Sequence, residues 1–122
     1  MPYRKLLLAI VAGGLVTGGS ALAQGALVEV DDDVQVPALG AVADTVDDWD
    51  VFDASGTGIG EVEDVVGTDA RTPTALAVDF DGKAGYPDRD VVVPLDRFTL
   101  QGNRLVLDAG PEAVKAMDDW RD

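Results

Sequence analysis

The stretch Ile59-Gly60-Glu61-Val62-Glu63-Asp64-Val65-Val66 decides the fold class. Small and apolar residues recur in it among carboxylates, which is typical of a strand with one buried side. The expected buried side carries Gly60, Val62 and Val66, and the expected solvent side carries Glu61 and Glu63. The preceding Asp53-Ala54-Ser55-Gly56 has the composition of a turn, so we predict a hairpin with a short strand at residues 51–52.

More strands are expected after residue 66. Residues 75–80 alternate between large apolar residues and small or acidic ones, the period of a half-buried strand. Residues 91–95 are almost entirely apolar, and Pro94 lacks an amide hydrogen, so this strand should bend or end there. A last hairpin is predicted over residues 98–107, because its Gln101-Gly102-Asn103 turn tolerates positive φ.

A short C-terminal helix is predicted to follow these strands. Gly110-Pro111 should start it, since proline at the first helical position sacrifices no hydrogen bond. Val114, Met117 and Trp120 are spaced to lie along one face, which should close one side of the sheet. The predicted fold class is therefore mainly β: five or six short strands in a small barrel, closed or nearly closed, because closure removes exposed strand edges.

Taken in order, these motifs resemble the PRC-barrel family. The resemblance rests on Val51-Phe52-Asp53-Ala54-Ser55-Gly56, on residues 59–66 and 75–79, and on Asp90-Val91-Val92-Val93-Pro94-Leu95-Asp96. It covers the chain from about Thr45 to Trp120. The family is named after the H subunit of photosynthetic reaction centres and also includes a ribosome-maturation factor. The resemblance implies a six-stranded PRC-type β-barrel with the short C-terminal helix beside it, a role in assembly or protein interaction, and no catalytic residues.

The N-terminal residues have the order of a secretory signal. Arg4 and Lys5 precede an apolar run over residues 6–16, and Ala21-Leu22-Ala23 supplies small residues for a signal peptidase. We expect a signal peptide at residues 1–23, cleavage after Ala23 and a periplasmic product without membrane insertion. The alternatives are an uncleaved N-terminal membrane anchor, for which the apolar run is short, and a secreted protein.

Residues 24–44 are predicted to be an acidic leader or linker. They combine Asp31-Asp32-Asp33 with Pro37 and Gly40 and show no sustained period, although their few apolar residues could add an edge strand. Thr45 is expected to cap one helical turn over residues 46–49. The PRC-barrel-like domain is accordingly assigned to residues 45–122.

The chain is strongly acidic, with 9 basic and 23 acidic residues and a net charge of −14. Loss of Arg4 and Lys5 with the signal would leave 7 basic residues, and 7 minus 23 gives −16. This charge argues against nucleic acid and anionic lipid as partners, because both are bound through clusters of basic residues. It favours solubility, attraction of cations and encounter with basic partners.

The residue types needed for most catalytic devices are missing. With no His and no Cys in the sequence, neither a nucleophilic triad nor the usual nitrogen and sulfur ligands of zinc can be assembled. Gly56-Thr57-Gly58-Ile59-Gly60 lacks the lysine and helix of a phosphate-binding loop and is interpreted as a hairpin turn. We predict that the protein is not an enzyme and has no catalytic, cofactor-binding or specific metal residues.

Calcium binding is expected to be weak. The carboxylates of residues 79–90 do not follow the ligand order of an EF-hand, and Asp31-Asp32-Asp33 is interpreted as a solvated charge run. The aromatic residues Trp49, Trp120, Tyr86 and Phe98 are expected in the core or at its rim, while an exposed Tyr86 would suit a partner contact.

We predict a noncatalytic periplasmic interaction or assembly module whose partner is an unidentified envelope protein. The alternative function is an acidic protein that binds divalent cations or serves envelope stress and salt tolerance.

Overall fold

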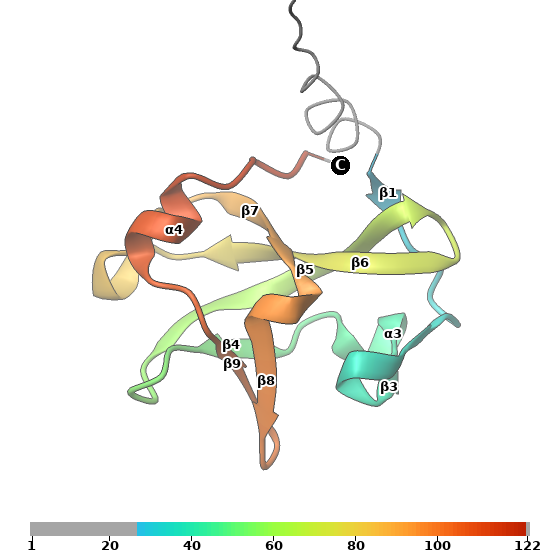
Figure 1. Cartoon of the computed structure of the whole chain (residues 1–122), viewed down its shortest axis with the longest axis horizontal. Coiled ribbons are helices and arrows are strands. Elements are labelled where there is room, and N and C mark those ends of the chain that lie inside the picture. The colour runs from blue at the N-terminus through green and yellow to red at the C-terminus, as the bar shows by residue number, and fades with distance from the viewer. Residues whose placement is uncertain (1–26, 122) are drawn as a thin grey trace, which may run out of the picture.

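The computed structural model describes residues 27–121 as a mainly β fold with two short α-helices (Figure 1). The predicted signal peptide therefore lies outside the described residues. The strands are β1 (Val28–Glu29), β2 (Gln35–Val36), β3 (Ala41–Val42), β4 (Asp50–Phe52), β5 (Gly58–Asp69), β6 (Thr72–Phe80), β7 (Asp90–Pro94), β8 (Phe98–Gln101) and β9 (Arg104–Leu107). The helices are α3 (Ala43–Val46) and α4 (Pro111–Lys115), with 3-10 turns η2 (Pro37–Leu39), η3 (Lys83–Gly85) and η4 (Leu95–Arg97).

Six strands form one curled sheet in the order β7-β6-β5-β4-β9-β8, and β1 adds to β5 beside this path. All neighbours are antiparallel except β4 and β9, where Val51 lies opposite Leu105 in a parallel pair. The predicted six-stranded PRC-type fold with a short C-terminal helix is thus confirmed. Its form is an open half-barrel, because the described ladders give β7 and β8 no pairing with each other (Figure 1).

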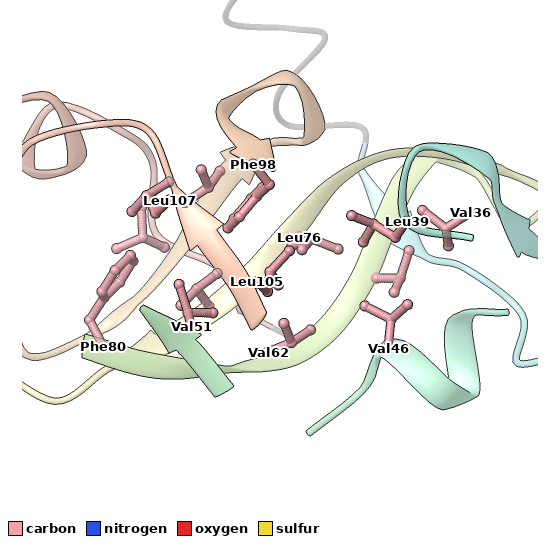
Figure 2. Packing of buried hydrophobic residues seen from close by; sticks show 14 of the residues in the cluster. Val36, Leu39, Val46, Val51, Val62, Leu76, Phe80, Phe98, Leu105 and Leu107 are labelled. Atoms are coloured by element: carbon pink, nitrogen blue, oxygen red, sulfur yellow. The ribbon is translucent and has the colours of Figure 1, made fainter. Parts of the chain in front are cut away.

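The main hydrophobic core fills the inside of the curl. Val62 on β5, Leu76 on β6 and Leu105 on β9 are at most 1% exposed and converge there with Phe80 (Figure 2). These side chains come from strands far apart in sequence, so they can be buried only when the sheet curls. The alternation predicted for residues 75–80 is confirmed by Leu76, Val78 and Phe80 on the core side.

A β-bulge in β5 changes the predicted side of Val66. Val62 lies opposite Val78 on the core side, but the register shifts between Val62 and Asp64. As a result Val65 enters the main core, and Val66 joins a second cluster on the other side of the sheet. The prediction that Val62 and Val66 share a side was therefore wrong, because the extra residue of a bulge reverses the alternation.

Residues 27–44 belong to the folded domain, which differs from the expected leader or linker. Val30, Val34, Val36, Leu39 and Ala43 are each at most 5% exposed and pack against the main core. Figure 2 shows Val36 and Leu39 beside the end of the core that Val46 occupies. Periodicity does not reveal this burial, because short turns and bridges space their apolar residues irregularly.

Both helices differ from their predicted positions. Helix α3 spans Ala43–Val46 with Val42 at its N-cap, so Thr45 lies inside the helix and caps nothing. Helix α4 starts at Pro111 as predicted but ends at Lys115. Trp120 therefore lies beyond α4 in an extended segment, because pairing with β7 replaces further helical turns.

Candidate functional site

Residues 116–120 follow α4, and we call them the C-terminal strap; its residues 118–120 lie along the edge of β7 (Figure 1). The amide of Val92 donates to the carbonyl of Asp118 at 2.8 Å, and the amide of Trp120 donates to the carbonyl of Asp90 at 3.0 Å. An antiparallel bridge joins Val91 to Asp119 between them. The strap therefore covers a strand edge that would otherwise be open to other chains.

Arg89 fastens the strap from the start of β7. Its guanidinium donates to the carbonyl of Lys115 at 2.9 Å and to that of Met117 at 3.4 Å. It also forms a hydrogen-bonded ion pair with the Asp119 carboxylate. One planar group thus fixes the end of α4 and two points of the strap, a geometry that Lys cannot reproduce.

The strap places Trp120 over the outer face of the sheet, which we define as the side of β5, β6 and β7 opposite the main core. The indole Nε1 donates a hydrogen bond of 2.9 Å to Oδ2 of Asp64. Around this bond lies the second cluster of Val66, Ala75 and Ala77. Asp64 is 7% exposed, so the indole supplies a partner for a carboxylate that is largely removed from water.

A groove of about 330 Å³ opens on the outer face beside Trp120. The lining is formed by Leu27, Thr74, Ala75, Val92, Pro94, Arg97 and residues 116–120. Much of its lining is apolar, with Ala75 buried and Leu27, Val92 and Trp120 partly exposed against the second cluster. We call this site the strap groove. Such a concave apolar site with few polar groups is the usual form of a binding pocket.

An acidic row borders the apolar part of the outer face. The β-ladders place Glu61 opposite Asp79, and Asp79 opposite Asp90. The next row consists of Asp64, Ala77 and Val92. Carboxylate oxygens of Glu63, Asp79 and Asp90 lie within 4.8 Å of one another. Like charges at directly opposed positions destabilise a sheet, so this row favours a cationic neighbour.

A second group of carboxylates lies around α3, with Asp32 before the helix, Asp44 in it and Asp47 at its C-cap. Carboxylate oxygens of Asp32, Asp44 and Asp47 lie within 4.8 Å of one another, and Oδ1 of Asp47 is buried without a hydrogen-bond partner. Burial, followed by the charges of Asp64 and Asp32, raises the pKa of Asp47 to about 6. This group can lower its energy by taking up a proton or a cation.

Tyr86, Phe98 and Trp49 lie in the core or at its rim, as predicted, whereas Trp120 packs on the second cluster. Tyr86 is 7% exposed, stacks on Phe80 with ring centroids 5.5 Å apart, and donates its hydroxyl to the Ala109 carbonyl at 2.6 Å. Tyr86 is therefore a core residue and is not exposed for a partner contact. Phe98 is also buried, and Trp49 packs on the main core while partly exposed.

The polar motifs of the sequence serve local structure. Oδ1 of Asp53 accepts from the amides of Ser55 and Thr57 at 2.9 and 3.0 Å, which confirms the predicted turn. Arg71 forms ion pairs with Asp31 and Asp33 at 3.7 and 2.8 Å. Two of the three carboxylates in the expected charge run therefore hold the turn between β5 and β6.

The comparison with protein families decides where this fold belongs. Residues 39–114 match the sequence profile of the PRC-barrel domain, more than half of the chain. The chain belongs to the PRC-barrel family. PRC-barrel domains are generally noncatalytic modules. A search of curated proteins gave no match.

The strap groove extends outside the part that matches the PRC-barrel family. The matched segment ends at Val114, whereas the strap comprises residues 116–120 and the opposite wall includes Leu27. Sequence reasoning missed the groove because Trp120 was assigned to a helix. Within residues 27–121, every helix is too short to cross a membrane.

Proposed function

We propose that this PRC-barrel protein is a noncatalytic interaction or assembly module that binds an envelope protein in the periplasm. The observation that carries the proposal is the strap groove: a concave apolar site on the outer face, lined by residues of β6 and β7 within the family domain and by the strap and Leu27 outside it. Burial of aromatic and aliphatic surface in such a site is what anchors most protein partners.

The chemistry of the groove supports a binding role over a catalytic one. Its titratable side chains are Arg97, Asp118 and Asp119, and all three are exposed to solvent. Exposed charges at a rim contribute orientation and association rate, whereas general acid–base catalysis needs a positioned group with a matched pKa. The absence of His and Cys from the sequence is consistent with this proposal.

The test is site-specific photocrosslinking in intact cells. A benzophenone amino acid placed at Thr74, an exposed residue of the groove on β6, should crosslink one reproducible envelope protein. The matched control is Thr99, an exposed threonine on β8 that does not line the groove. The proposal fails if neither position gives a protein adduct under several growth conditions.

The proposed location has its own test. Cleavage after Ala23 would give a mature chain that starts at Gln24, and the intact mass of the protein from a periplasmic extract reports this directly. Recovery of the uncleaved chain in the membrane fraction would favour the anchored alternative.

A second candidate function is binding of a divalent cation by Asp32, Asp44 and Asp47. It is favoured by the buried Oδ1 of Asp47, which has no hydrogen-bond partner and lies within a group of close carboxylates. Calcium takes such oxygen ligands. At fixed ionic strength, calcium should then raise the melting temperature of the protein but not that of Asp47→Asn, and an equal response would exclude this site.

A further inference from the structure

We propose that the strap groove and the acidic row together form a docking surface for a basic amphipathic segment of a partner protein. The inference rests on the proposed function and specifies the chemistry of the partner. The segment that fits this surface has apolar side chains that enter the groove and Lys or Arg side chains beside them.

The apolar half of the surface calls for apolar anchors. Leu27, Val92 and Trp120 remain partly exposed around the buried Ala75, so a visiting side chain would remove further apolar area from water. The strap already occupies the edge of β7. Recognition here therefore depends on side chains and not on addition of a strand.

The acidic half calls for positive charge on the same partner. Glu61, Asp79 and Asp90 follow one another across three strands, and the next row along the strands carries Ala77 and Val92. Asp118 extends the negative charge to the wall of the groove. Basic side chains of a partner would complement the negative charge of this row, which no apolar partner would do.

The charge of the whole chain agrees with this choice. A net charge of −14 steers basic molecules toward the protein from a distance, and Arg97 is the one basic residue among those that line the groove. Steering acts on the whole surface, however, so the experiment must separate local complementarity from net charge.

The experiment measures binding of fluorescent synthetic peptides to the purified protein by anisotropy. The probe is a short peptide of alternating Leu and Lys. One control peptide replaces Leu by Ser to keep the charge, and another replaces Lys by Glu to keep the apolar residues. We expect binding of the Leu–Lys peptide alone.

Two pairs of variants locate the binding surface. Asp118→Asn should weaken the affinity about threefold, while Asp108→Asn, which removes an equal charge outside the groove, should change it little. Thr74→Phe, which fills the groove, should weaken it about tenfold or more, while Thr99→Phe should not. If Thr74→Phe does not fold, the comparison of Asp118→Asn with Asp108→Asn still tests the inference.

Equal binding of the Ser–Lys peptide, or equal effects of Asp118→Asn and Asp108→Asn, would overturn the inference in favour of net charge alone. So would the absence of peptide binding. If photocrosslinks to an envelope protein form from Thr99 but not from Thr74, the docking surface is excluded while the proposed interaction role survives.

Discussion

Trp120 and Asp64 are joined by a 2.9 Å hydrogen bond, although 56 positions separate them in the sequence. The bond ties the C-terminal strap to the middle of β5, across the outer face. Asp64 is the one charged residue among residues 27–121 that is buried, and the indole of Trp120 contacts its Oδ2. This one hydrogen bond therefore both holds the strap in place and gives the buried Asp64 carboxylate a donor.

Trp120→Phe should destabilise the fold by about 1–3 kcal/mol, because it keeps an aromatic ring but leaves a buried charged acceptor without its donor. Urea unfolding measures this loss. Asp64→Asn retains an acceptor for the indole and should cost less. Equal losses for the two variants would mean that the hydrogen bond is not what Trp120 contributes.

Asp47 should make the protein more stable in mild acid. Burial, and then the charge of Asp64, raises its pKa from 3.8 to about 6. The folded state therefore holds the Asp47 proton more tightly than the unfolded state. The stabilisation that this proton gives the folded state is complete below about pH 4 and is lost as the pH rises through about 6. Asp47→Asn should remove this slope and raise the stability at pH 7 by about 1 kcal/mol after allowance for solvent screening.

Melting curves between about pH 4.5 and 7 measure the effect of Asp47. Hydrogen bonds from Ser55 lower the pKa of Asp53, and those from Arg71 lower that of Asp69, so both act below this window. Asp88→Asn, in an exposed loop, is the control and should keep the slope. A slope that persists in Asp47→Asn would assign the titration to another group.

Gly60 should be irreplaceable, because a Cβ atom there would lie 2.5 Å from the carbonyl oxygen of Asp79 on β6. Gly60→Ala should cost about 2 kcal/mol or more, since the backbones of β5 and β6 must separate. Gly110→Ala is the control, because nothing lies within 4 Å of its Cβ position. Equal unfolding midpoints in denaturant would contradict the register in which Gly60 faces Phe80.

Stability should rise with salt. The mature chain would carry 7 minus 23, or −16, charges, and self-repulsion reaches about 30 Å at 0.01 M salt but about 10 Å at 0.1 M. The melting temperature should therefore increase between these salt concentrations, equally for sodium and choline chlorides. A melting temperature that does not change would show that the carboxylates are locally compensated.

The sequence predicted the strands of the barrel because their signals are local. Turn residues and period-2 alternation mark residues 51–52, 75–80 and 98–107, and these became β4, β6 and the hairpin of β8 and β9. The side of the sheet on which Val66 lies was predicted wrongly, because the alternation of residues does not show where a bulge occurs. Burial of Val30 and Val34 was missed because irregular segments show no period.

The candidate site was less predictable, since it depends on contacts between distant segments. Met117 and Trp120 do show helical spacing, but the strap is extended because Arg89 and the edge of β7 supply its hydrogen bonds. No local sequence pattern predicts the pairing of the strap with β7. The acidic row was equally hidden, because Glu61, Asp79 and Asp90 become neighbours only in the folded sheet.

The strap also affects the order of folding. A chain that emerges N-terminus first can complete all strands of the sheet before residues 118–120 reach β7. During that interval the amide of Val92 and the carbonyl of Asp90 are open to pairing with a second molecule. We expect Arg89 to shorten this interval, because it bonds the carbonyls of Lys115 and Met117 and the carboxylate of Asp119. Its loss would then be seen first as aggregated product during synthesis, before any change in the equilibrium stability of molecules that fold.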